Sequence, residues 1–222
     1  MLQTATIHFL ENLKKNNSKE WFDLNRKLYE LAKADFYNLV TNLIAEFGKK
    51  DTSIALLQPK NCIFRINRDI RFSKDKSPYK TNFGASFSKN GKKIMAAGYY
   101  LHIEPNNSFV GGGIYMPDAA TTKKVRQEID YNFDEFKEII NHKKFNTQYS
   151  DLDKSEEVSL LREPKGYDKE NKAIAYLKLK SWIAMSPLSN ADLTNKELIK
   201  KIVTAFESLQ PLIQFLNKAI EV

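Results

Sequence analysis

Apolar residues recur every three or four positions over the first 47 residues, which is the spacing of one face of an α-helix. Asn16-Asn17-Ser18 interrupts this spacing and supplies capping side chains, so we expect two successive helices. The second helix begins near Trp21, bends near Asn25 and ends at Gly48. Its apolar face begins with Trp21, Leu24, Leu28 and Leu31. We expect Trp21 and Phe22 to pack in the core, and Lys14-Lys15 to lie on a solvated helix face.

The pattern changes after Cys62, where apolar and polar residues begin to alternate at the period of two that is typical of a strand. The first alternating segment is 64–72, with Phe64, Ile66, Ile70 and Phe72 on its apolar face. Further strands are predicted over 82–88, 97–104 and 108–116, with turns at Asn90-Gly91 and 105–107. Gly111-Gly112-Gly113 predicts a flattened or bulged strand against which a neighbour packs on bare backbone.

Helical spacing returns at Asp118, which can cap a helix over 119–131. Further helices are predicted over 134–141 and 171–179, and a further strand over 182–185. Thr194 and Glu197 have the spacing of a capping box, which would open a last helix that Pro211 kinks or splits. The whole pattern predicts a single α+β domain of residues 1–222. Its antiparallel sheet of about four or more strands lies in the middle of the chain, flanked by N-terminal and C-terminal helices.

Composition excludes several classes of protein. No uninterrupted apolar stretch reaches the ~18 residues of a membrane-spanning helix, and the first residues lack the pattern of a signal peptide. Cys62 is the only cysteine, so no intrachain disulfide can form, which fits a reducing cytosol. We therefore expect a cytoplasmic protein without a membrane partner, and Cys62 as a buried small hydrophobe. With one cysteine and three histidines we expect no metal site, and no motif indicates a cofactor.

The net charge of +8 is concentrated in one segment. Residues 60–93 hold ten basic and two acidic residues, and the rest of the chain holds 25 of each sign. Over 64–72, period two places Arg65, Asp69 and Arg71 on one strand face, where Asp69 would orient the guanidinium groups toward a phosphate or carboxylate. Arg68 falls on the apolar face and needs a partner, for which Glu104 and Asp69 are candidates.

The loop that follows adds three lysines and three hydroxyl side chains, with Pro78 limiting its flexibility. Together these residues predict a ligand site for an anion, with Tyr79 as an aromatic wall. The candidate ligand-binding residues are Arg65, Arg68, Arg71, Lys74, Lys76, Tyr79 and Lys80.

His102 and Glu104 form a second candidate for chemistry. Alternation puts Tyr100, His102 and Glu104 on one face of the predicted strand and Tyr99, Leu101 and Ile103 on the other. A histidine beside a carboxylate can be an oriented general base, although such a pair is more often a structural hydrogen bond. The weak catalytic candidates are His102, Asp69 and Glu104, and the sequence leaves open whether the protein is an enzyme.

Four segments carry a resemblance to a known family: 9–30 (FLENLKKNNSKEWFDLNRKLYE), 64–87 (FRINRDIRFSKDKSPYKTNFGASF), 98–117 (GYYLHIEPNNSFVGGGIYMP) and the helix of Arg126. The sequence resembles the uncharacterised, mainly bacterial family catalogued as domain of unknown function 2461. The resemblance covers nearly the whole chain and implies a compact cytoplasmic protein of unknown biochemical role. It supplies no catalytic residues. Asn106-Asn107 replace a Gly-Gly pair frequent in the family, and asparagine tolerates the positive φ of such a turn.

Three functions remain open from the sequence. The first is binding of an anionic small molecule, phosphorylated compounds included, which requires the basic groups to converge on a concave pocket. The second is a nucleic-acid-binding module, which requires a flat or grooved basic surface with Phe72, Tyr79 and Phe83 available to stack bases. The third is a non-enzymatic scaffold, whose arginines would pair with protein carboxylates. The oligomeric state cannot be read from the sequence.

Overall fold

The computed structural model describes residues 1–89, 91 and 95–220 of the chain. The chain forms two compact units. The first unit comprises Met1–Lys93, Tyr100–Val110 and Pro187–Thr204, and the second comprises Ile94–Tyr99, Gly111–Ser186 and Ala205–Val222. The organisation as a single domain stays a prediction.

Four strands form one antiparallel sheet in the order β1-β2-β3-β4, which confirms the α+β class. The strands are β1 (Phe83–Phe87), β2 (Gly98–Ile103), β3 (Ser108–Ile114) and β4 (Trp182–Leu188). The alternation predicted for β2 is confirmed, because Tyr99, Leu101 and Ile103 are buried while Tyr100 and His102 are partly exposed. The predicted Asn90-Gly91 turn includes Asn90, which lies outside the described residues.

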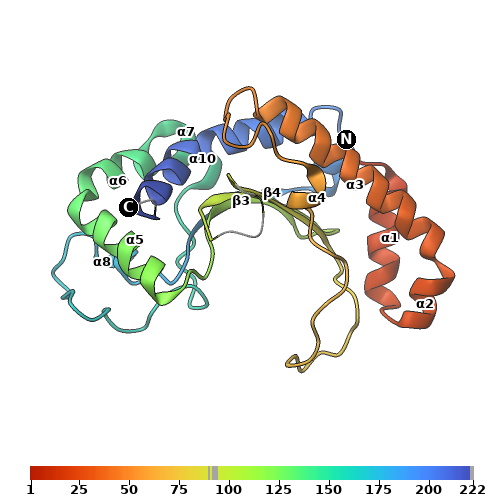
Figure 1. Ribbon diagram of the computed structural model, residues 1–222, viewed down its shortest axis with the longest axis horizontal. Coiled ribbons are helices and arrows are strands. Elements are labelled where there is room, and N and C mark those ends of the chain that lie inside the picture. The colour runs from red at the N-terminus through yellow and green to blue at the C-terminus, as the bar shows by residue number, and fades with distance from the viewer. Residues whose placement is uncertain (90, 92–94, 221–222) are drawn as a thin grey trace. The chain divides into compact units, whose positions relative to one another are not determined.

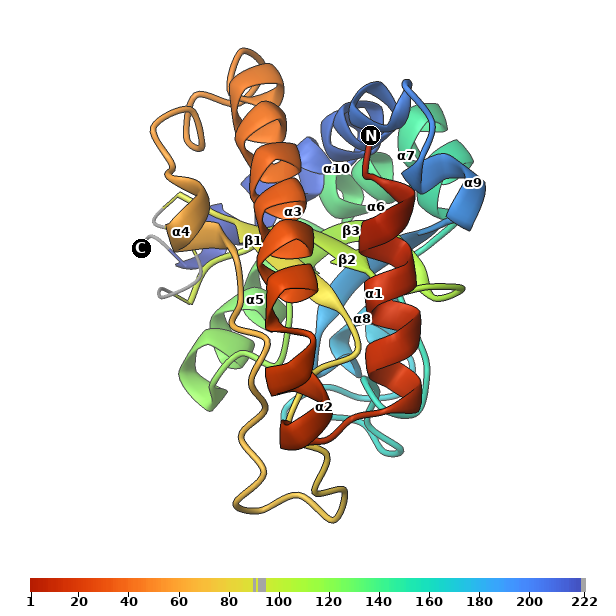
Figure 2. The same cartoon turned by 90° about the vertical axis from the view of Figure 1, so that its right-hand side faces the viewer.

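The strand predicted over 64–72 is wrong. This segment belongs to a long loop between α4 (Pro59–Cys62) and β1, and the loop extends beyond α2 (Lys19–Leu24) in Figure 2. Its backbone makes only isolated bridges, Ile63 with Ala85 and Asn67 with Tyr79. The apolar alternation does not mark a buried face, since Phe72 is 95% exposed. The fourth strand of the sheet is β4 instead.

The helices of the first unit begin with α1 (Thr4–Lys15), α2 and α3 (Arg26–Phe47). α1 and α3 lie side by side (Figure 2). At Asn25, where a bend of one helix is predicted, the structure instead has two separate helices, α2 and α3, while the predicted end at Gly48 is confirmed. Ser18 caps α2 by accepting a hydrogen bond of 3.2 Å from the backbone N–H of Trp21.

The expected apolar face of α2 and α3 is wrong at three positions. Leu24, Leu28 and Leu31 are 87%, 51% and 69% exposed. The buried face of these helices is rotated away from them: Phe22 is buried, and Phe36 of α3 stacks on Phe83 of β1 with ring centroids 5.3 Å apart. Trp21 is half-buried rather than in the core.

The first unit also contains α9 (Asn190–Leu193) and the start of α10 (Leu198–Ile220). The capping box lies one helix earlier than predicted, because Ser189 and Asp192 form it at the start of α9. Before α10, the side chain of Asn195 accepts a hydrogen bond of 2.8 Å from the N–H of Glu197. Pro211 lies inside α10, so the helix is not split there.

The second unit contains α5 (Ala119–Tyr131), α6 (Phe133–Asn141), α7 (Lys143–Tyr149) and α8 (Ile174–Leu177). α5, α6 and α8 lie together in Figure 1, and the predicted cap of α5 is confirmed by a hydrogen bond of 2.7 Å from the N–H of Thr121 to Asp118. Trp182 is fully buried, and its indole N–H donates to the carbonyl of Tyr176 at 3.0 Å.

The glycine run in β3 packs against bare backbone, as predicted. A Cβ on Gly111 would lie 2.3 Å from the carbonyl oxygen of Ala184, and a Cβ on Gly113 would lie 1.9 Å from that of Trp182. Gly113 also has a φ of +126°. Glycine is therefore required at Gly113 both for the close approach of β4 and for the backbone conformation. In the first unit, Cys62 is buried as expected.

Candidate functional site

A polar pocket of about 310 Å³ lies within the first unit. We refer to it as the polar pocket. Its lining residues are Lys14, Asn17, Arg68, Asp75, Ser77, Tyr79, Lys80, Thr81 and Asn82. Three of these residues are cationic and one is anionic. Lys14 belongs to α1 and most of the others to the loop before β1, so residues far apart in the sequence form one concave site.

Asn17 holds the loop in place at this pocket. Its side-chain amide donates to the carbonyl of Tyr79 at 2.9 Å, and its side-chain oxygen accepts from the N–H of Tyr79 at 3.1 Å. The ring of Tyr79 stacks on Phe22 with centroids 3.9 Å apart and planes 13° apart. Backbone and ring of Tyr79 are thus both fixed against the helices.

Arg68 and Asp75 form one charged group of the pocket. The guanidinium of Arg68 donates to Asp75 and, at 3.3 Å, to the hydroxyl of Ser73. Asp75 also accepts from the N–H and the hydroxyl of Ser77 at 2.9 and 2.7 Å. The hydrogen bonds from Ser77, and then that from Arg68, hold the pKa of Asp75 far below its ordinary value. Asp75 therefore stays ionised at any physiological pH.

The partners expected for Arg68 from the sequence are wrong. Asp75 takes the place of Glu104 and Asp69, the two candidates from the sequence. The physical reason is that 64–72 is a loop rather than a strand. The chain reverses between Arg68 and Asp75, and the N–H of Arg68 bonds to the carbonyl of Pro78 at 2.9 Å.

Glu104 accepts hydrogen bonds from both Lys14 and Thr81 and so links α1 to the loop before β1. Its carboxylate accepts from the hydroxyl of Thr81 at 2.7 Å, from the amide of Asn107 at 3.0 Å and from the ammonium of Lys14 at 3.4 Å. Burial by itself would raise the pKa of Glu104. The hydrogen bonds from Asn107, Thr81 and His102 and the charge of Lys14 outweigh that effect and hold the pKa below its ordinary value.

His102 lies next to Glu104, as the sequence predicts. Its Nε2 is 3.5 Å from a carboxylate oxygen of Glu104, and its Nδ1 is 3.3 Å from the hydroxyl of Tyr100 and 3.4 Å from the amide of Asn82. The ring stacks on Phe109 at 4.7 Å. Burial lowers the pKa of His102 although Glu104 opposes the shift, and burial raises the pKa of Tyr100 to about 12.

His102 and Glu104 are absent from the lining of the polar pocket but bond to residues that are part of it. Glu104 fixes Lys14 and Thr81, and His102 contacts Asn82. Both ring nitrogens of His102 already face protein groups. The pair thus links side chains of the polar pocket to one another, and a catalytic role for His102 or Glu104 stays a prediction.

The other candidates from the sequence divide into two sets. Lys80 lines the pocket with Arg68 and Tyr79, and its ammonium donates to the carbonyl of Arg65 at 3.0 Å. Outside the lining lie Arg65, Arg71, Lys74 and Lys76. Asp69 forms a bidentate ion pair with Arg71. Its Oδ1 accepts from Nε of Arg71 at 3.0 Å and its Oδ2 from Nη2 at 2.7 Å, and both side chains are exposed. The ammonium of Lys76 donates to the carbonyl of Ile70 at 3.0 Å.

Lys14, Asn17, Asp75 and Asn82 are pocket residues that the sequence analysis does not predict. Lys14 lies on an exposed helix face, as predicted, with its side chain 58% exposed, but the sequence does not indicate its ion pair with Glu104, which lies 90 residues later in the chain. Asn17 was explained by its place between two helices, where Ser18 is the actual cap. A local pattern carries no signal for either contact, since both depend on the tertiary fold.

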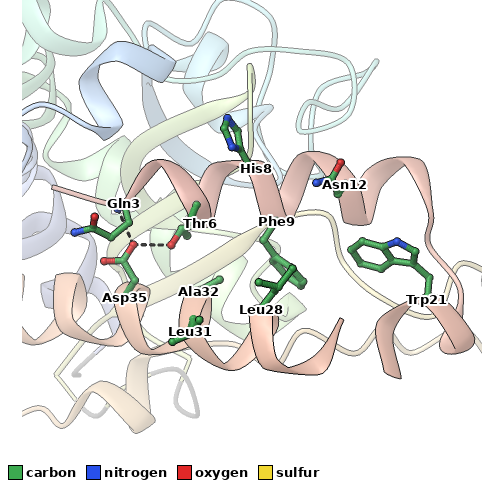
Figure 3. Close-up of a pocket in the computed structure, with 11 residues that line it drawn as sticks. Gln3, Thr6, His8, Phe9, Asn12, Trp21, Leu28, Leu31, Ala32 and Asp35 are labelled. Carbon is green, nitrogen blue, oxygen red and sulfur yellow. Dashed lines mark hydrogen bonds between the residues drawn. The ribbon is translucent and has the colours of Figure 1, made fainter. Parts of the chain in front are cut away.

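A second pocket of about 450 Å³ lies between α1 and α3 (Figure 3). Apolar side chains dominate its lining, among them Phe9, Trp21, Leu28 and Leu31. Asp35 lies at one side and accepts from the N–H of Gln3 at 2.8 Å and from the hydroxyl of Thr6 at 2.6 Å (Figure 3). The lining contains no lysine or arginine among the described residues, so this apolar groove does not suit an anion.

The described residues contain neither a cluster of metal-binding side chains nor a membrane-spanning helix. No group of three or more histidine, cysteine, aspartate or glutamate side chains there has the arrangement needed to hold a metal ion. Within that same part of the chain, none of the helices combines the length and the apolar character that crossing a membrane requires.

Comparison with known proteins places the chain in a family. Neither the curated proteins nor the solved structures contain a match to it. A family model described as "Conserved hypothetical protein (DUF2461)" matches residues 5–215, which confirms the resemblance seen in the sequence. Since that match spans nearly its whole length, the chain belongs to the DUF2461 family of conserved hypothetical proteins.

Proposed function

We propose that the protein binds an anionic small molecule, with a phosphate group as the anion, in the polar pocket. The observation that carries the proposal is the convergence of Lys14, Arg68 and Lys80 on one concave site of about 310 Å³. Ammonium and guanidinium groups bind phosphate oxygens through charge-assisted hydrogen bonds, which are about twice as strong as neutral ones. The neutral polar residues of the lining add further hydrogen-bonding groups around the anion.

The two other functions fit the site less well. A nucleic-acid interface would use Phe72, Tyr79 and Phe83 to stack bases, and Tyr79 and Phe83 are buried. A scaffold would use its arginines only in internal ion pairs. Arg68 and Arg71 do pair with Asp75 and Asp69, but Arg68 also shares a pocket with two lysines. Both observations support the small-molecule proposal over its alternatives.

Isothermal titration calorimetry with inorganic phosphate and pyrophosphate tests the proposal. Lys14→Met is the informative variant and Lys15→Met its matched control, because Lys15 is the next residue of α1, is exposed and does not line the pocket. Loss of one charge-assisted hydrogen bond costs about 1.5–3 kcal/mol, so we expect Lys14→Met to weaken binding by about 10-fold or more. Lys15→Met should keep the wild-type affinity.

Two results would overturn the proposal. One is the absence of saturable binding of inorganic phosphate, of pyrophosphate and of small phosphate monoesters to the wild-type protein at low salt. The other is an equal loss of affinity in Lys14→Met and Lys15→Met, which would indicate a diffuse attraction to the basic segment rather than a pocket.

A further inference from the structure

The polar pocket has features that restrict which phosphate compound it can take. We infer that its ligand is a phosphate monoester of a small polyhydroxyl compound, such as a sugar or polyol phosphate, rather than a nucleotide. This inference rests on the proposed function and specifies it further. Three properties of the lining carry it: its charge, its lack of an exposed ring and its carboxylate.

The charge of the lining matches a single phosphate monoester. Lys14, Arg68 and Lys80 carry three positive charges and Asp75 one negative charge, which leaves a net charge of +2 on the lining, and Glu104 outside the lining offsets part of the charge of Lys14. A phosphate monoester carries about −1.5 to −2 at pH 7. A nucleoside triphosphate would bring more negative charge than these residues neutralise.

The lining offers no ring on which a nucleobase could stack. Tyr79 is the only aromatic residue among the described lining residues, its ring is stacked on Phe22, and the residue is only 6% exposed. Sites that hold bases use exposed aromatic faces or apolar slots, each base contact contributing about 1–3 kcal/mol. The volume of about 310 Å³ is also near the lower end for small-molecule sites, which favours a compact ligand.

Asp75 indicates what the rest of the ligand must contain. The phosphate group of a monoester dianion has no hydrogen-bond donor and is repelled by an ionised carboxylate, so it cannot itself satisfy Asp75. Its Oδ2 accepts from Arg68 and its Oδ1 accepts twice from Ser77. A carboxylate oxygen has about two acceptor positions, so Oδ2 retains one for a ligand hydroxyl. A ligand with both a phosphate and hydroxyl groups satisfies the cations and Asp75 together.

Calorimetry on the full chain tests the inference with four probes: inorganic phosphate, glycerol 3-phosphate, glucose 6-phosphate and AMP. We expect at least one of the two polyol phosphates to bind about 10-fold tighter than both inorganic phosphate and AMP. Asp75→Asn should reduce that preference, because an amide lowers both the attraction for a hydroxyl and the repulsion of free phosphate. Asp69→Asn is the matched control, as Asp69 also pairs with an arginine of this loop but lies outside the pocket.

The outcomes separate this inference from the proposed function. If AMP or inorganic phosphate binds as tightly as both polyol phosphates, the inference is wrong and the proposed anion site stands. If Asp75→Asn and Asp69→Asn change the preference equally, the assignment of the hydroxyl to Asp75 is wrong. If none of the four probes binds saturably, the proposed function fails as well. Thermal unfolding of both variants establishes that they remain folded.

Discussion

The side chain of Asn17 pairs with the backbone of Tyr79 in the way that one strand pairs with another, through one donated and one accepted hydrogen bond. This pair ties the connection between α1 and α2 to the long loop before β1, 62 residues further along the chain. It compensates for the absence of a regular strand in that loop. The position of Tyr79, Lys80 and Thr81 at the polar pocket therefore depends on Asn17.

Replacement of Asn17 by alanine should destabilise the protein. The N–H and the carbonyl of Tyr79 would both lose their partner in a largely buried position, and each unpaired buried group costs about 1–3 kcal/mol. We expect a loss of about 2–4 kcal/mol in the free energy of unfolding, measured by urea denaturation. Asn16→Ala is the control, because the Asn16 amide bonds only within the end of α1 and is exposed. Equal losses in the two variants would contradict the role assigned to Asn17.

The comparison of Asn17 with Asp118 shows how much of the fold was predictable. Asp118 caps a helix through residues three positions away, so the local pattern sufficed to predict it. The contacts of Asn17 and Lys14 reach residues 62 and 90 positions away, and no local pattern contains them. Most helices and the strands β1, β2 and β3 could be predicted from the spacing of apolar residues, and the close packing at Gly111–Gly113 from the glycines themselves. The pocket could not be predicted in this way, because its residues come together only in the complete fold.

The prediction of a strand over 64–72 is wrong for a related reason. Alternation of apolar and polar residues predicts a strand only if a neighbouring strand supplies hydrogen bonds and a covered face. Ile66 does find a buried position, but Phe72 does not. The chain instead turns back through the pair of Arg68 and Asp75. The charge count pointed to the segment 60–93, of whose cations Arg68 and Lys80 line the polar pocket, together with Lys14 from outside that segment.

Gly113 should tolerate no side chain. Alanine there would place its Cβ 1.9 Å from the carbonyl oxygen of Trp182 in a backbone with a φ of +126°. We expect Gly113→Ala to lower the free energy of unfolding by about 2–5 kcal/mol, since overpacking and an unfavourable φ add. Gly166→Ala separates the two causes, because Gly166 has a φ of +94° and open space around it. A loss no larger in Gly113→Ala than in Gly166→Ala would show that the close approach of β4 contributes nothing.

Arg71 should contribute little to stability despite its close pair with Asp69. Both side chains are exposed, at 76% and 46%, and exposed ion pairs are typically worth less than about 1 kcal/mol. We expect Arg71→Ala to change the free energy of unfolding by no more than about 0.5 kcal/mol in urea denaturation at physiological salt. A loss above about 2 kcal/mol would instead favour the scaffold hypothesis, in which the arginines of this loop serve only to hold the fold.

His102 should make the stability of the protein depend on pH in a defined window. Its folded pKa lies below the ordinary value of 6.5, chiefly because the ring is buried. The unfolded chain therefore binds a proton at His102 at a higher pH than the folded protein does. The stabilisation is complete above about pH 6.5 and is lost as the pH falls toward the lowered folded pKa. Glu104 acts in a separate, lower window, since its folded pKa lies below 4.5.

Urea denaturation between pH 8 and pH 4 measures this dependence. We expect the unfolding midpoint of the wild-type protein to fall with decreasing pH already above pH 4.5, where the carboxyl group of Glu104 is not yet protonated. His102→Gln should reduce that slope below about pH 6.5, because glutamine has no proton to bind. His8→Gln, which replaces an exposed histidine of α1, is the control for loss of an imidazole. An unchanged slope in His102→Gln would mean that burial of the ring does not oppose its protonation. The interpretation of His102 as a neutral imidazole beside the pocket would then be wrong.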